Sequence, residues 1–250
     1  MPRFFVEPDM ISEGFVQIHG DDAHHISYSL RMAKGDIVTV CDTEGLEYKC
    51  SLADFSDKCV VAKIISRELS RSEPPFYAKL YQALPKGDKF DTVIQKAVEC
   101  GVSEIIPFIS ERCIAKESCT EENKQKRRNR ISLEASKQSG RGRIASVHSV
   151  LSFEKMLEDA CTGSDIVLFC YEGEGTLPLG KILHGEKERL SKVKYPVVSV
   201  IIGSEGGFSQ GEAERAKNCG VFMCGLGNRI LRTETASGFV LACLVYEFEL

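Results

Sequence analysis

Two uninterrupted apolar runs, residues 165–171 (DIVLFCY) and 195–202 (YPVVSVII), lie in the second half of this 250-residue chain. Such runs are typical of strands that are buried on both faces, as in parallel sheets covered by helices. Between residues 89 and 100, apolar side chains recur instead at helical spacing, and Gly101 follows as a C-terminal cap. The alternation of these patterns predicts an α/β domain with a largely parallel sheet.

Further patterns complete this predicted domain. Strands are expected at 77–84, 105–109 and 221–224, and helices at 121–138, 153–160, 209–218 and 233–248.

The first 70 residues show a different pattern of predicted elements, in which short strands dominate. Runs at 36–41 and 46–52 flank the turn 42–45 and predict a hairpin, and 58–66 predicts a third strand. A short helix is expected between Gly20 and Arg31, so this region predicts a small β-barrel. The polar, proline-ended stretch 67–75 looks like a linker. The predicted domains are therefore 1–72 and 73–250.

Composition restricts the remaining classes of protein. We find no apolar run long enough for a transmembrane helix and expect no signal peptide, so the predicted location is the cytoplasm. The eleven cysteines include no Cys-x-x-Cys pair and are expected to be reduced and mostly buried. The pair His24-His25 has no further ligand at suitable spacing, so no metal site is expected.

The net charge of −4 hides a local basic segment. Residues 1–72 carry 8 basic and 12 acidic side chains, whereas residues 124–143 carry eight basic residues and one acid. Such a segment suits a local anionic partner, although an exposed, solvated helix face would give the same pattern. The candidate phosphate contacts are Arg127, Arg128, Arg130, Lys137, Arg141 and Arg143, with Arg31 and Lys34 in the first domain.

The stretch 175–181 (GTLPLGK) resembles a phosphate-binding P-loop but fails in two places. Ile182 stands where a hydroxyl is required for magnesium, and Pro178 lacks the backbone N–H that such a loop offers. We therefore expect an ordinary surface loop here, and a nucleotide-binding ATPase is disfavoured.

Two glycine-containing segments near the C-terminus each follow a strand and precede a helix. In 202–208 (IGSEGGF), the glycines permit close backbone approach, and Ser209 with Glu212 predicts a capping box. In 226–236 (LGNRILRTETA), Thr233 is predicted to cap the last helix. Two such segments indicate one ligand held by both, and Glu205 indicates that this ligand carries no phosphate there.

The chain resembles the ribosomal RNA small-subunit methyltransferase E family of the SPOUT superfamily. The matching motifs are 29–31 (SLR) with Gly35-Asp36, 84–87 (LPKG), 95–97 (QKA), 134–141 (EASKQSGR), 202–208 and 226–236. Two positions depart from the family pattern, because Ser204 and Ala145 stand where proline is usual.

The resemblance implies a SPOUT-type parallel sheet with a C-terminal trefoil knot, a PUA-like RNA-binding barrel at the N-terminus, and a homodimer. It also implies S-adenosylmethionine as cofactor and N3 of a uridine in 16S (small-subunit) ribosomal RNA as methyl acceptor. Glu205 is the hypothetical base or orienting residue, and Arg232 the hypothetical oxyanion partner. The implied cofactor-binding residues are Ile202, Gly203, Ser204, Gly206, Gly207, Leu226, Gly227, Arg229, Ile230 and Leu231.

Two alternatives stay open. The first is a non-catalytic RNA-binding or ribosome-assembly factor of the same fold. The second is a 2′-O-ribose RNA methyltransferase.

Overall fold

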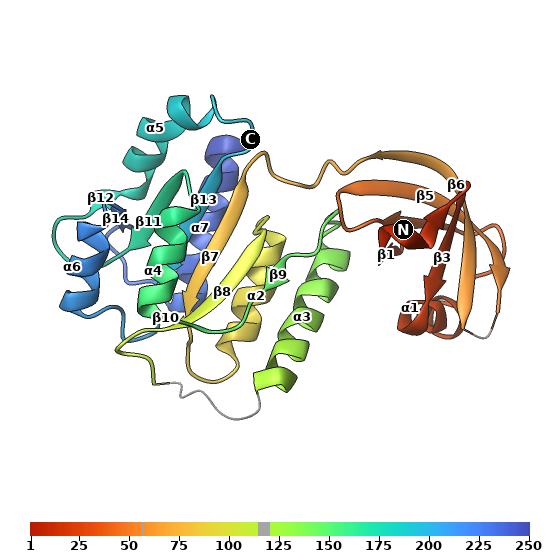
Figure 1. Cartoon of the computed structure of the whole chain (residues 1–250), viewed down its shortest axis with the longest axis horizontal. Helices are drawn as coiled ribbons and strands as arrows, with labels where there is room; N and C mark the ends of the chain where they lie inside the picture. The colour runs from red at the N-terminus through yellow and green to blue at the C-terminus, as the bar shows by residue number, and fades with distance from the viewer. Residues whose placement is uncertain (57, 115–120) are drawn as a thin grey trace. The chain divides into compact units, whose positions relative to one another are not determined.

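The computed structural model describes residues 1–56, 58–114 and 121–250 (Figure 1). The chain divides into two compact units, one formed by Met1–Glu73 with Ser136–Ile144 and the other by Pro74–Ala135 with Ala145–Leu250. Ser136–Ile144 therefore packs with the first unit, although it lies far beyond the domain boundary predicted after residue 72.

The first unit is built on a six-stranded sheet in the order β1-β4-β5-β6-β3-β2. Neighbouring strands are antiparallel except β1 and β4, and the predicted hairpin is the pair β4–β5. Among the described residues no pairing joins β1 to β2, so barrel closure stays a prediction. The elements are β1 (Arg3–Phe5), η1 (Pro8–Met10), β2 (Ile11–Ser12), β3 (Phe15–His19), α1 (Gly20–His24), η2 (His25–Ser29), β4 (Ile37–Cys41), β5 (Leu46–Phe55) and β6 (Cys59–Leu69).

The predicted linker 67–75 is wrong for most of its length. Residues 67–69 continue β6, and Ser70 N donates to Gly45 O at 2.9 Å. Glu73 accepts hydrogen bonds from Arg141 Nη2 at 2.7 Å and Gly142 N at 2.9 Å. The polar residues of the stretch 67–75 therefore form hydrogen bonds inside the first unit.

The second unit contains an eight-stranded sheet in the order β10-β8-β7-β13-β11-β14-β12, with β9 beside β8. Every recorded pairing in this sheet is parallel, which confirms the predicted α/β class. The elements are β7 (Tyr77–Ala83), α2 (Lys89–Glu99), β8 (Glu104–Ile109), α3 (Glu121–Gln138), β9 (Ser146–Val147), β10 (Leu151–Ser152), α4 (Phe153–Thr162), β11 (Ile166–Cys170), β12 (Leu177–Pro178), α5 (Leu179–Leu190), β13 (Val197–Ile202), α6 (Gln210–Asn218), β14 (Phe222–Gly225) and α7 (Thr233–Phe248).

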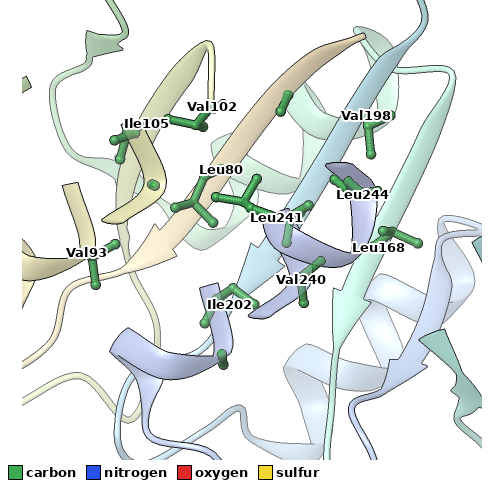
Figure 2. Close-up of a cluster of buried hydrophobic side chains, with 14 of the residues drawn as sticks. Leu80, Val93, Val102, Ile105, Leu168, Val198, Ile202, Val240, Leu241 and Leu244 are labelled. Carbon is green, nitrogen blue, oxygen red and sulfur yellow. The ribbon is translucent and has the colours of Figure 1, made fainter. Parts of the chain in front are cut away.

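Helices cover both faces of this sheet, which explains the uninterrupted apolar runs. Leu80, Val198 and Ile202 belong to a core shared with α2, α5 and α7. Figure 2 shows these strand side chains beside Val240 and its neighbours on α7. Strand residues of the opposite parity, such as Ile201, pack against α4 and α6. Both parities are therefore apolar, as expected for strands buried on two faces.

The surface loop expected at 175–181 is wrong, because α5 begins at Leu179. Leu179, Ile182 and Leu183 are buried in the core at helical spacing. Pro178 occupies the N-cap position, where a missing N–H costs nothing.

Three further properties concern the described residues only. In these ranges, no helix combines the length and apolarity that a bilayer crossing requires. Nor does any group of three or more His, Cys, Asp or Glu side chains there form a metal-binding cluster. The described cysteines are free thiols, of which Cys161 and Cys219 are exposed, and Cys119 lies outside the described residues.

An ion pair at the edge of the second sheet gives a pH-dependent stability. His148 Nε2 lies 3.4 Å from Glu104 Oε2, and Tyr77 donates to Glu104 Oε1 at 2.6 Å. The hydrogen bond from His148 lowers the pKa of Glu104 to about 2, and the same bond raises the pKa of His148. The lowered carboxyl contributes stability above its usual pKa of 4.5 and loses it as the pH falls towards 2. The raised imidazole contributes below its usual pKa of 6.5 and loses its contribution as the pH rises.

We therefore expect the stability advantage of the wild type over His148→Gln to be largest near pH 5.5. It should shrink towards about pH 8.5, as the imidazole of His148 loses its proton, and urea unfolding at both values measures it. His184→Gln is the matched control, because that ring is exposed and lies 3.9 Å from Glu247. An equal advantage at both pH values would exclude the charged pair.

Candidate active site

The first glycine segment is a tight turn at the carboxyl end of β13. Ser204 and Gly207 form an isolated antiparallel bridge, and Gly207 N donates to Ser204 O at 2.9 Å. A Cβ on Gly203 would lie 3.2 Å from Gly207 Cα and 3.1 Å from Phe208 Cε2, so a larger residue would require these neighbours to shift by a few tenths of an ångström.

Helix α6 begins directly after this turn, and the predicted capping box is confirmed. Ser209 Oγ accepts from Glu212 N at 3.3 Å, and Glu212 Oε2 accepts from Ser209 N at 2.9 Å. Glu212 Oε1 also accepts from Glu111 N at 2.9 Å. The Glu212 carboxylate thus also binds the loop that follows β8.

The second glycine segment connects β14 to α7. Gly227 has a φ of 102°, a backbone conformation that favours glycine. Within the described part of the chain, no backbone N–H or C=O of residues 227–231 makes a hydrogen bond to another backbone group outside regular elements. These groups are therefore free to bind a ligand.

A buried amide joins the two segments. Gln82 on β7 is fully buried, and its Nε2 donates to Thr233 Oγ1 at 2.8 Å and to Gly203 O at 3.4 Å. The Thr233 hydroxyl in turn donates to Gly203 O at 2.7 Å. The cap predicted for Thr233 is therefore wrong: Arg232 is the N-cap residue, and Thr233 uses its hydroxyl to bind the first segment.

Sequence analysis did not identify Gln82 as a site residue. The available signal was a single amide-bearing side chain near the carboxyl end of the mostly apolar strand 77–84. A polar residue at such a buried position requires hydrogen-bond partners, and here the amide nitrogen finds them in the two segments and in Ala83 O at 3.0 Å, while Oε1 has none among the described residues.

Glu205 is held by a third loop, between β7 and α2. Its Oε1 accepts from Lys89 Nζ at 2.6 Å and from Lys86 N at 3.2 Å. Partial burial raises the pKa of this carboxyl, but the bonds from Lys89 and from backbone amides outweigh it and leave the pKa below its usual value. Arg112 Nη1 donates to Gly206 O at 3.1 Å. Glu205 is therefore an ionised anchor of the turn and a weak base.

The other predicted residues of the two segments differ in exposure. Ile202, Ser204 and Thr233 are buried, and Leu226 and Leu231 are half-buried against the core. Gly206, Gly227, Arg229, Ile230 and Arg232 are exposed. In both segments a continuous stretch of exposed residues, 205–206 in the first and 227–230 in the second, lies between more buried ones.

The predicted phosphate contacts are spread over both units, and most of them have partners within the protein. Arg128 is buried with its guanidinium 5.0 Å from the Phe90 ring centre, and Arg127 pairs with Asp91. The other pairings are Lys137 with Asp22 at 2.7 Å, Arg141 with Glu73 at 2.7 Å, Arg143 with Glu44 O at 2.8 Å and Lys34 with Asp54 at 2.8 Å. Arg31 and Arg130 are exposed. An RNA contact by Arg128 or Arg141 would have to break an internal contact.

A cavity of about 350 Å³ lies elsewhere in the second unit. It is lined by Lys79, Glu104, Ile106, His148, Ser149, Leu151, Lys155 and Asp159. These residues come from β7, β8, the stretch from His148 to β10, and α4, whereas the two glycine segments follow the carboxyl ends of β13 and β14. We therefore assign the ligand site to the glycine segments on hydrogen-bonding geometry.

Comparison with known proteins shows the family to which the chain belongs. The family described as "RNA methyltransferase domain" matches residues 72–245, and the "RNA methyltransferase PUA domain" matches residues 18–65. The chain is 34% identical to the ribosomal RNA small subunit methyltransferase E of Bacillus subtilis, covering 100% of this chain and 98% of that protein.

Two solved structures are also similar. The Neisseria gonorrhoeae ribosomal RNA small subunit methyltransferase E, bound to S-adenosyl methionine, is 27% identical with a TM-score of 0.85, covering 98% of this chain and 97% of that one. A putative methyltransferase from Legionella pneumophila, in complex with the same cofactor, is 28% identical with a TM-score of 0.81, covering 98% and 96%. With its two joined glycine segments at the carboxyl edge of a parallel sheet, the chain belongs to the ribosomal RNA small subunit methyltransferase E family.

Proposed function

We propose that this chain transfers a methyl group from S-adenosylmethionine to N3 of a uridine in 16S ribosomal RNA. The observation that carries the proposal is the hydrogen-bonded link Gln82–Thr233–Gly203, which fixes both glycine segments around one ligand site. The names of the related proteins support ribosomal RNA of the small subunit as substrate. The intact link disfavours a non-catalytic assembly factor, which has no need of a rigid cofactor site.

The residues present fit this cofactor. Ser204 Oγ and Glu234 Oε2 are buried, and neither has a hydrogen-bond partner among the described residues. The backbone groups of 227–231 are available in the same region. An adenosine offers N–H and hydroxyl groups to such acceptors and donors, and no phosphate meets Glu205. Together with Ile202, Gly203, Gly206, Gly207 and Leu226, these residues would hold the cofactor.

When bound, S-adenosylmethionine supplies a methyl group on a positively charged sulfur. The two segments fix where the acceptor nitrogen must lie, and positioning of this kind supplies much of a transfer rate. The uridine N3 must lose its proton as it is methylated. The negative charge that develops is shared with the carbonyl oxygens on either side of N3. We assign Arg232, exposed at the end of the second segment, to stabilise that charge.

Glu205 is assigned an orienting role. Its lowered pKa and its bond to Lys89 Nζ weaken it as an acceptor of the N3 proton, so we assign no base, and the proton released by the overall transfer ends in bulk solvent. Its bonds to Lys89 and to Lys86 N hold the first segment against the β7–α2 loop.

Glu205→Gln is therefore expected to raise the KM for the cofactor more than it lowers kcat, because the amide still accepts a hydrogen bond. We expect Lys89→Met to shift the same KM in the same direction, since it removes the other half of the pair. Steady-state kinetics at saturating RNA measures both effects. A loss of kcat of about 100-fold or more with unchanged KM would instead make Glu205 the base.

Several finer properties belong to the same proposal. After β14, α7 returns to pack on β13 and β7, a path that supports a trefoil knot at the C-terminus. On α7, Phe239, Ala242 and Tyr246 form an exposed apolar stripe, which supports a homodimer. The match to a PUA domain supports a closed barrel in the first unit. Because the proposed substrate is ribosomal RNA of the small subunit, we propose that the protein acts in the cytoplasm.

Mass mapping of modified nucleosides tests the reaction. Ribosomal RNA from cells lacking the protein is incubated with purified enzyme and the cofactor. The expected product is one additional 3-methyluridine in 16S ribosomal RNA. Methylation of a ribose 2′-oxygen would establish the alternative enzyme, and binding of the cofactor without any product would establish the assembly factor.

A further inference from the structure

The first unit carries an exposed aromatic stack that no part of the proposed reaction uses. His24, the last residue of α1, and Tyr28 on η2 have ring centres 4.5 Å apart and planes inclined by 27°. Tyr28 is 64% exposed, and in the described part of the chain its hydroxyl makes no hydrogen bond. His24 covers one face of the Tyr28 ring, and much of the rest of that ring is open to solvent.

The backbone under this stack is firmly anchored. Ala23 and Ile26, which flank the two aromatic positions, are buried in the core of the first unit. Leu30 N donates to His25 O at 2.9 Å, which closes a π-helical turn, and Met32 N donates to Ile26 O at 3.0 Å. π-Turns inside helices occur frequently at functional sites. The stack is therefore presented on a fixed scaffold.

Arg31 follows the stack in an unusual conformation. Its φ is 53°, in the left-handed region that side chains other than glycine rarely occupy. Its side chain is exposed, so no packing requires an arginine here. Strain of this kind is often retained where the side chain has a function.

The first unit stays acidic on balance, so contact with an anionic partner depends on individual cations beside the stack. Asp22, on the same helix as His24, is neutralised by Lys137 Nζ at 2.7 Å. Three basic residues, Lys137, Arg141 and Arg143, join the acidic residues 1–73 when Ser136–Ile144 packs with this unit. Exposed aromatic rings beside cations are the usual means by which proteins bind unpaired bases of RNA.

We propose that the His24–Tyr28 stack is a binding site for an unpaired base of the RNA substrate, and that Arg31 contacts the adjoining phosphate. The inference rests on the proposed function only in taking RNA as the ligand. The occupant is single-stranded RNA, because the bases of a duplex are already stacked on one another and present only their edges.

The test uses a short single-stranded RNA that carries one 2-aminopurine, whose fluorescence is quenched by stacking. Wild type and Tyr28→Phe are expected to quench it equally, since both rings stack. Tyr28→Ala should lose the quenching and bind the RNA about 5- to 150-fold more weakly. Leu69→Ala is the matched control, because Leu69 is 75% exposed in the same unit but has no ring. Arg31→Gln should reduce the salt dependence of binding, whereas Tyr28→Ala should leave it unchanged.

Two further measurements separate this proposal from the proposed reaction. Calorimetry should give wild-type cofactor affinity for Tyr28→Ala, and kinetics should show a raised KM for RNA at unchanged kcat. Suppose that the wild type methylates no RNA but quenches the 2-aminopurine, and that Tyr28→Ala loses this quenching. The proposed reaction would then be wrong and the proposed base site correct. Wild-type affinity and quenching in Tyr28→Ala, or equal binding of the matching duplex, would overturn the base site.

Discussion

Glu73→Ala is expected to lower the free energy of unfolding by about 3–5 kcal/mol, because it leaves a buried guanidinium without its carboxylate. The Arg141 side chain is 4% exposed, and its Nη2 and Nε lie 2.7 and 3.0 Å from the two oxygens of Glu73. Glu73 Oε1 also accepts from Gly142 N at 2.9 Å and from Arg143 N at 3.2 Å. Urea unfolding followed by circular dichroism measures the loss.

Glu68→Ala is the matched control for this prediction. Glu68 lies in the same unit and forms an exposed ion pair with Arg71 at 3.6 Å, so its removal should cost about 0–1 kcal/mol. If Glu73→Ala cost no more than the control, the Arg141 cluster would not stabilise the first unit.

Gly203→Ala is expected to weaken binding of S-adenosylmethionine by about 100-fold or more, equivalent to about 2.8 kcal/mol. The new Cβ would lie 3.2 Å from Gly207 Cα and 3.3 Å from Gly207 C, and because both are backbone atoms we expect the turn to relieve these contacts by opening. An opened turn moves Ser204, Gly206 and Gly207 away from the second segment. Isothermal titration calorimetry with the cofactor measures the change.

Gly211→Ala provides the matched control, because a Cβ at that position in α6 meets no atom within 4 Å. It should bind the cofactor as the wild type does, and replacing a helical glycine should stabilise the protein by about 0.5–1 kcal/mol. Wild-type cofactor affinity in Gly203→Ala would remove the first segment from the site.

The regular elements of the second unit could be predicted because each depends on a local pattern. Helix α2 has its buried residues at helical spacing, and Gly101 follows it with a φ of 84°. Helix α5 was not predicted, although Leu179, Ile182 and Leu183 stand at helical spacing beside the P-loop-like pattern. Its signal was present in the sequence.

The partners of polar side chains could not be predicted in the same way. Gln82 and Thr233 are 151 positions apart, and no local pattern records that they meet. The same holds for Arg141 and Glu73, which read as parts of a basic helix end and a linker. Sequence therefore indicated which segments form the candidate site, while the bonds that join them depend on how distant strands and loops pack.

The first unit is made of two separate stretches of the chain, and this has a consequence for its synthesis. Most of this unit leaves the ribosome first, yet Arg141 and its neighbours in Ser136–Ile144 emerge some seventy residues later. Domains commonly fold in order during translation, but this one is completed only after much of its successor has been made. A nascent chain stalled before residue 136 would expose Glu73 without its cation, so this early intermediate is where chaperone binding and proteolysis should concentrate.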